Sequence, residues 1–217
     1  MNRAILFLVL AASFFAFACN NNNSNVNKTA ANTPPFAADA KPVADPEIAV
    51  IETEGFGTIK IELYSNIAPK TVAQFKTLAR SGFYNGTTFH RINSSLIQGG
   101  DPNSKDDDPS NDGMGNSDLP NMPHEFSDVP YDAGIVGAAR RGAGGGMSEQ
   151  QAWDTSNCQF FIMTKRVPNF DKLYTVFGKV IEGLNNVRII SNAPTGAPGS
   201  ERPLEKIVIK SVVIQPK

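Results

Sequence analysis

Hydrophobic and polar residues alternate along much of the chain from about residue 47 onward. The segment 58–64 places Ile59, Ile61 and Leu63 on one face of a strand, and 47–53 predicts its partner, joined by a turn at 54–57. Clusters of Gly, Pro and Asp separate six more short apolar segments. These predict strands at 88–92, 96–98, 134–139, 159–164, 174–180 and 206–214.

Two segments show helical spacing instead. Pro69 suits the first position of a helix, and Val72, Phe75 and Leu78 recur three residues apart until Gly82 offers a left-handed stop. A second helix is expected at 184–190. Many short strands with only two helices favour a mainly β fold, a closed antiparallel barrel with the helices over its ends, rather than alternating βαβ units.

The N-terminal segment has a different character. Arg3 precedes an unbroken run of apolar and small residues at 4–18, which is shorter than the roughly 20 needed to span a bilayer and predicts a signal peptide over 1–18. The run ends at Cys19 and resembles a bacterial lipoprotein processing site, so Cys19 is expected to carry lipid. An ordinary secretory signal with an incidental cysteine is the alternative.

Residues 20–46, after the expected lipidated Cys19, are rich in Asn, Ala, Thr and Pro and predict a flexible tether. We therefore expect an exported protein of the cell envelope, anchored to a membrane and facing the periplasm or the exterior. The mature cysteine count agrees, since Cys158 would then have no partner for a disulfide.

Charge and composition exclude several functions. The 217 residues include 20 basic and 21 acidic ones, for a net charge of -1, so the positive field of a nucleic-acid-binding protein is absent. His90 and His124 are the only histidines, and no metal site is expected. The acidic stretch 103–121 faintly resembles a calcium loop but has Leu119 at the twelfth position, which favours a solvated loop. No dedicated interface is visible, and a monomer is expected.

Four ordered motifs carry a family resemblance: Phe-His-Arg-Ile at 89–92, Leu-Ile-Gln-Gly-Gly-Asp at 96–101, Cys-Gln-Phe-Phe-Ile at 158–162, and Tyr-Thr-Val-Phe-Gly-Lys-Val at 174–180. With 57–86, they resemble the cyclophilin family over residues 47–217. The resemblance implies an eight-stranded barrel, a groove for proline-containing polypeptides, and peptidyl-prolyl cis/trans isomerase activity without a cofactor. It implies Arg91 as the catalytic residue, and substrate binding by His90, Leu96, Gln98, Ala139, Arg140, Gln159, Phe161, Phe170 and Tyr174.

The chemistry suits these residue types. Rotation about an X-Pro amide meets a barrier of roughly 18–20 kcal/mol, and the proline nitrogen regains a lone pair in the twisted transition state. A fixed guanidinium such as that of Arg91 can donate to this nitrogen. Five decades of acceleration require about 7 kcal/mol, whereas one charge-assisted hydrogen bond contributes roughly 1.5–3 kcal/mol. Apolar walls and polar contacts such as Gln98 must therefore contribute the rest.

One position departs from the family pattern. Ser95 stands where the resemblance leads us to expect an aromatic side chain, and the segment between Arg91 and Gln98 is one residue short. Loss of a ring from the pocket should weaken proline binding. The alternative function is therefore a non-catalytic cyclophilin-fold chaperone or proline-peptide binding module.

Overall fold

The computed structural model describes residues 39–217. The predicted signal peptide, Cys19 and most of the predicted tether lie outside these residues. Closer to the sheet, Asp45 contacts the rest of the domain, because its carboxylate pairs with Lys76 at 2.6 Å and accepts a hydrogen bond from the Ser65 hydroxyl at 2.6 Å. The last part of the predicted tether is thus tied to the folded unit.

Eight strands form one antiparallel sheet, as predicted. The order of the strands in the sheet is β3-β4-β6-β5-β7-β2-β1-β8. The strands are β1 (Glu47–Thr53), β2 (Gly57–Leu63), β3 (Arg91–Ile92), β4 (Leu96–Gly99), β5 (Ile135–Ala138), β6 (Phe160–Met163), β7 (Val176–Glu182) and β8 (Ile209–Pro216).

The sheet is an open half-barrel, so the expected closed barrel is wrong. Its two edge strands, β3 and β8, do not pair with each other. A bridge between Thr88 and Val208 and a hydrogen bond from the Phe89 N–H to the Ile207 carbonyl (2.9 Å) join the segments that precede them. This contact is an isolated bridge, and β3 itself has two residues and pairs with β4.

Two helices bury their apolar faces in the main core, as expected. These are α1 (Pro69–Arg80) and α3 (Leu184–Ser191), which contribute Phe75 and Ile190 among others. Glu125 accepts hydrogen bonds from the N–H groups of Lys70 and Thr71, both at 2.9 Å, and so caps the first turn of α1. No helix among residues 39–217 is long and apolar enough to cross a membrane.

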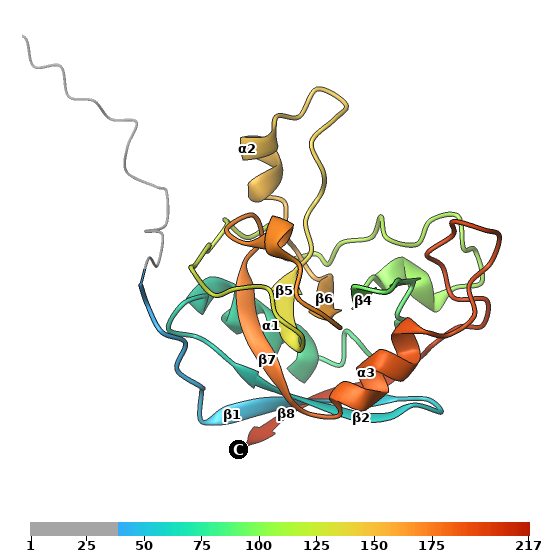
Figure 1. Cartoon of the computed structure of the whole chain (residues 1–217), viewed down its shortest axis with the longest axis horizontal. Helices are drawn as coiled ribbons and strands as arrows, with labels where there is room; N and C mark the ends of the chain where they lie inside the picture. The colour runs from blue at the N-terminus through green and yellow to red at the C-terminus, as the bar shows by residue number, and fades with distance from the viewer. Residues whose placement is uncertain (1–38) are drawn as a thin grey trace, which may run out of the picture. The chain divides into compact units, whose positions relative to one another are not determined.

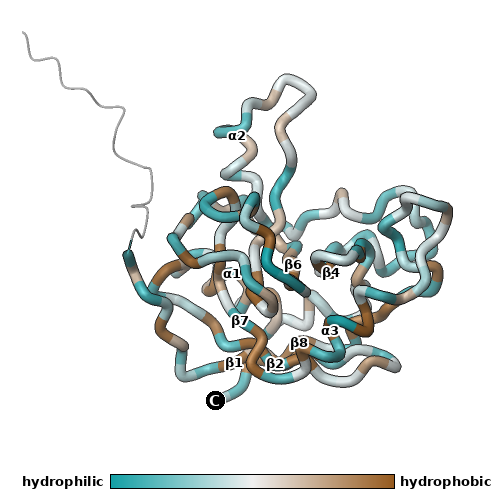
Figure 2. The backbone as a smooth tube through the Cα atoms, viewed as in Figure 1, coloured by the Kyte–Doolittle hydropathy of each residue, from teal (hydrophilic) through white to brown (hydrophobic). Residues whose placement is uncertain are grey.

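A third helix, α2 (Glu149–Trp153), was not predicted. It begins with a capping box, in which the Ser148 hydroxyl accepts from the Gln151 N–H and the Gln151 side chain accepts from the Ser148 N–H. The helix stands away from the sheet on a long loop (Figure 1). Hydrophobic positions concentrate in the strands, whereas this loop is largely polar or neutral (Figure 2). Two 3-10 turns, η1 (Pro102–Lys105) and η2 (Pro168–Phe170), complete the elements.

Candidate active site

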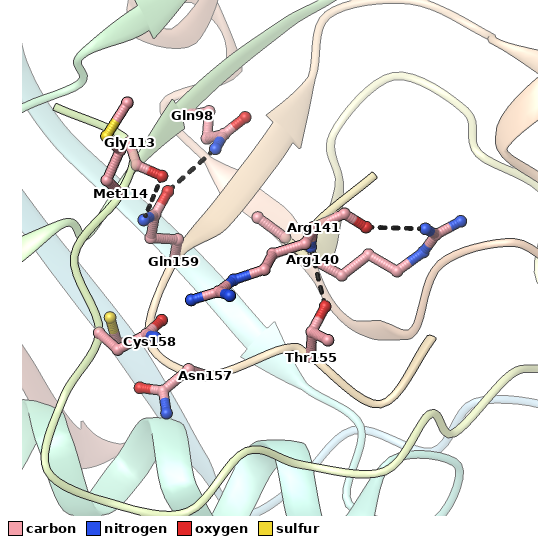
Figure 3. A pocket seen from close by; sticks show the side chains of 11 residues that line it. Gln98, Gly113, Met114, Arg140, Arg141, Thr155, Asn157, Cys158 and Gln159 are labelled. Atoms are coloured by element: carbon pink, nitrogen blue, oxygen red, sulfur yellow. Dashed lines mark hydrogen bonds between the residues drawn. The ribbon is translucent and has the colours of Figure 1, made fainter. Parts of the chain in front are cut away.

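A line of side-chain hydrogen bonds crosses three neighbouring strands. The sheet register pairs Arg91 of β3 with Gln98 of β4. Arg91 Nη1 donates to Gln98 Oε1 at 3.1 Å, and Gln98 Nε2 donates to Gln159 Oε1 at 3.1 Å. Gln159, just before β6, donates in turn to the carbonyl of Gly113 at 3.1 Å (Figure 3) and to that of Gly115 at 3.0 Å. The structure therefore brings these three predicted site residues together.

Glu201 holds the other edge of the Arg91 guanidinium. Arg91 Nε donates to Glu201 Oε2 at 2.5 Å, and Asn93 Nδ2 donates to Glu201 Oε1 at 2.7 Å. Partial burial favours the protonated acid, but hydrogen bonds from Arg91 and Asn93 and the charge of Arg91 together hold the pKa of Glu201 below its ordinary value. The Arg91 side chain nevertheless remains 45% exposed, so its guanidinium is oriented by Glu201 and Gln98 while part of it stays accessible to a substrate.

An aromatic group lies beside this line on the same face of the sheet. The Phe161 ring meets those of Phe170 and Tyr174 edge-on, with centroids 5.7 and 5.5 Å apart, and stacks on Tyr131 at 5.7 Å. Predicted site residue Leu96 belongs to the same hydrophobic cluster. The three predicted aromatic walls are thus brought together, and Tyr131 is a neighbour that sequence reasoning missed.

Gly137 of β5 makes room for the Phe161 ring. A methyl group at Gly137 would overlap the edge of that ring and come within 2.7 Å of the Tyr131 hydroxyl oxygen. The absence of a side chain at this position lets the ring lie directly against the strand. This requirement explains why glycine interrupts an otherwise apolar strand.

A cavity of about 430 Å³ opens next to the glutamine pair (Figure 3). Predicted site residues Ala139 and Arg140 line it together with Gln98 and Gln159. Cys158 also lines it, and burial raises the pKa of its thiol to about 12. The thiol is therefore protonated near neutral pH and does not supply a nucleophile.

His90 is not brought to this face. The residue is only 7% exposed and lines a separate cavity of about 230 Å³, together with Asp112 and Arg202. Neither ring nitrogen has a hydrogen-bond partner among the described residues. Consecutive residues of an extended chain point to opposite sides, so His90 and Arg91 cannot both face one groove. The expected substrate contact of His90 is therefore not supported by its position.

Comparison with known proteins assigns the family. Residues 48–214 match the family model described as "Cyclophilin type peptidyl-prolyl cis-trans isomerase/CLD". A probable peptidyl-prolyl cis-trans isomerase of Brucella suis is 37% identical over 177 residues, covering 79% of this chain and 86% of that protein. The peptidyl-prolyl cis-trans isomerase CYP18-1 of Arabidopsis thaliana is 36% identical, covering 73% and 90%.

A solved structure agrees. The cyclophilin type peptidyl-prolyl cis-trans isomerase of Cryptosporidium parvum superposes with a TM-score of 0.67 at 31% identity, covering 79% of this chain and 98% of that one. The chain belongs to the cyclophilin type peptidyl-prolyl cis-trans isomerase family. Some relatives are longer: the isomerase-like 2 protein of Gibberella zeae is 38% identical, but the matched region is only 25% of its length.

Proposed function

We propose that this chain is a peptidyl-prolyl cis/trans isomerase in which Arg91 stabilises the twisted X-Pro bond without forming a covalent intermediate. The observation that carries the proposal is the guanidinium of Arg91, held by Glu201 at 2.5 Å and Gln98 at 3.1 Å while its side chain stays 45% exposed. Such a preorganised donor favours the transition state because it does not have to reorient as the amide twists.

The neighbouring groups supply the remaining stabilisation in this proposal. Gln98 and Gln159 fix the guanidinium and offer polar contacts to the substrate backbone, while Phe161, Phe170 and Tyr174 form an apolar wall for the proline ring. A related Cryptosporidium parvum structure, 30% identical with a TM-score of 0.66, was determined in the presence of the dipeptide Ala-Pro. That ligand chemistry agrees with a proline-binding wall.

The test is relaxation of short X-Pro peptides after a jump in cis content, measured with the full chain and with Arg91→Ala. Removing one charge-assisted hydrogen bond of roughly 1.5–3 kcal/mol should lower kcat/KM about 10- to 150-fold. Arg91→Lys keeps the charge but loses the planar fork, and should recover only part of the activity. Equal activity of the native chain and a folded Arg91→Ala protein would contradict the role of Arg91.

The second candidate is a binding module without turnover. It is favoured by Ser95, which stands where the family pattern has an aromatic side chain, because a pocket that lacks this ring should hold the twisted proline less firmly. A native chain that binds a proline peptide but does not accelerate its relaxation would establish this second function.

We also propose that the isomerase acts on exported proteins from a lipid anchor on Cys19, on the strength of the N-terminal sequence. Expression of the native chain and of Cys19→Ala in a bacterial host tests this proposal. The native chain should sediment with membranes and Cys19→Ala should not, because the tether at 20–46 has two lysines and two aspartates and so provides no polybasic attraction to lipid. Membrane association of both proteins would overturn the assignment.

A further inference from the structure

The cavity beside Gln98 and Gln159 carries an unbalanced positive charge. Its volume is about 430 Å³, and among residues 39–217 Arg140 and Arg141 are the only charged residues that line it. The other polar side chains of its wall are neutral amides and a hydroxyl, and no acidic residue of the described range lines it. The two arginines differ in whether their guanidinium groups already have partners in the protein.

Arg140 is already occupied. Its Nε donates to the Leu173 carbonyl at 3.1 Å, Nη2 bonds the Glu149 carboxylate at 2.5 Å, and its guanidinium lies over the Tyr174 ring, 4.6 Å from the centroid. The side chain is only 4% exposed. Arg140 also donates from Nη1 to the Arg141 carbonyl at 3.0 Å, so its role is to fix the loop that carries Arg141.

Arg141 is held through its backbone and leaves its side chain free. Its N–H donates to the Thr155 hydroxyl at 2.9 Å, and its carbonyl accepts the bond from Arg140. Within residues 39–217 its guanidinium makes no ion pair or hydrogen bond. Figure 3 shows the guanidinium extending across the cavity toward Gln159 and Cys158. A fixed backbone with an unpaired cation in a concave site favours an anionic ligand.

The cavity is close enough to Arg91 to receive part of the same substrate. Gln98 lines the cavity and also accepts the hydrogen bond from Arg91 Nη1. An extended peptide advances roughly 3.3 Å per residue, so a side chain within about three residues of the reacting proline reaches the cavity. We infer that Arg141 makes this enzyme prefer substrates with an Asp or Glu side chain within three residues of the proline. The inference rests on the proposed isomerase function and adds a substrate class to it.

The experiment uses the full chain and pairs of X-Pro peptides that differ only by Glu or Gln at each position from three before to three after the proline. Within each protein, the ratio of kcat/KM for the Glu and Gln peptides cancels effects on overall activity. At low salt we expect a ratio of about three to ten at one position or two adjacent ones, falling toward one in 1 M salt. Arg141→Gln should bring the ratio to about one, and Arg141→Glu should reverse the preference toward a Lys peptide.

Arg188→Gln is the matched control, because Arg188 is an exposed arginine on α3 with only a 3.4 Å contact to Asn185, and it does not line the cavity. It should keep the native Glu/Gln ratio. Equal ratios in the native chain and in Arg141→Gln would overturn the inference while the isomerase function stands. If no peptide is turned over, the proposed function fails instead, and the affinities of the same labelled peptide pairs, measured by fluorescence anisotropy, decide the role of Arg141.

Discussion

Phe160 and Phe161 are neighbours in β6, but their side chains point to opposite faces of the sheet. Phe160 points into the main core, where its ring meets Phe75 at 5.7 Å, and both side chains are at most 4% exposed. Phe161 points to the other face, where Phe170 and Tyr174 cover it from a loop and stay partly exposed themselves. The two phenyl rings are almost equally buried, at 1% and 3% exposure. The burial of a residue alone therefore does not separate a core residue from a site residue, whereas the partial exposure of the residues that cover it does.

Removing the inner ring should have the largest effect on stability. Phe160→Ala leaves a cavity among Phe75, Tyr84 and Phe89, whose rings lie 5.7, 5.7 and 6.2 Å away, and should cost about 3–5 kcal/mol of unfolding free energy. Urea denaturation measures this loss. Phe160→Leu serves as the control, since it refills most of the volume and should cost clearly less. A loss below about 1 kcal/mol in Phe160→Ala would contradict the inner-face assignment.

Displacing the outer ring should affect activity more than stability. Gly137→Ala places a methyl group against the Phe161 ring and should push it toward Phe170 and Tyr174. We expect an overpacking cost of about 1–3 kcal/mol and a fall in kcat/KM of roughly tenfold or more. The control is Gly196→Ala, where the nearest atom to an added methyl group is 3.6 Å away. An unchanged kcat/KM in Gly137→Ala would separate Phe161 from the active site.

Glu201 is a positioning residue, because it holds the Arg91 guanidinium on the same face of the sheet as Phe161. Glu201→Gln keeps the shape but removes the negative charge beside Arg91, so kcat/KM should fall about three- to tenfold at pH 7. Because the pKa of Glu201 is below its ordinary value of 4.5, the native enzyme should lose activity only as the pH falls through that lowered value. Glu201→Gln should lack this acidic limb. A role in folding alone would leave the shape of the pH profile unchanged.

Much of the fold could be predicted from the local pattern of apolar and polar residues. Alternation in the first two strands, and short apolar segments bounded by Gly, Pro and Asp in the other six, located all eight strands, and the period of α1 placed its buried face. The alternation along β6 required Phe160 and Phe161 to face opposite sides, and the family resemblance selected Phe161 for the groove. The strands, the buried helix face and the opposite orientations of Phe160 and Phe161 depend on neighbours in sequence, which is why a single chain reveals them.

Contacts between distant loops were not predictable in this way. Glu201 reaches Arg91 across 110 positions from an irregular loop, where no periodic pattern marks it. Tyr131 also lies in a loop. The strand predicted at 88–92 is shorter in the structure, where β3 comprises Arg91–Ile92 and lies at an open edge of the sheet. The α2 helix did leave a local signal, since Ser148 and Gln151 have the spacing of a capping box.

The smallest effect is expected from His90, whose burial should make the stability of the protein depend on pH. Burial lowers the pKa of its imidazole below the ordinary 6.5, against the opposing influence of Asp101 and Asp112. The unfolded chain therefore binds a proton more readily than the folded protein, so stability should fall as the pH decreases from about 6.5 toward the lowered pKa. Each unit between the two values corresponds to about 1.4 kcal/mol. Urea denaturation at pH 7.5 and 5.5 should show a smaller decline for His90→Phe than for the native chain. Equal declines in the unfolding free energy of the two proteins would contradict this prediction and would mean that water reaches the His90 ring in the folded protein.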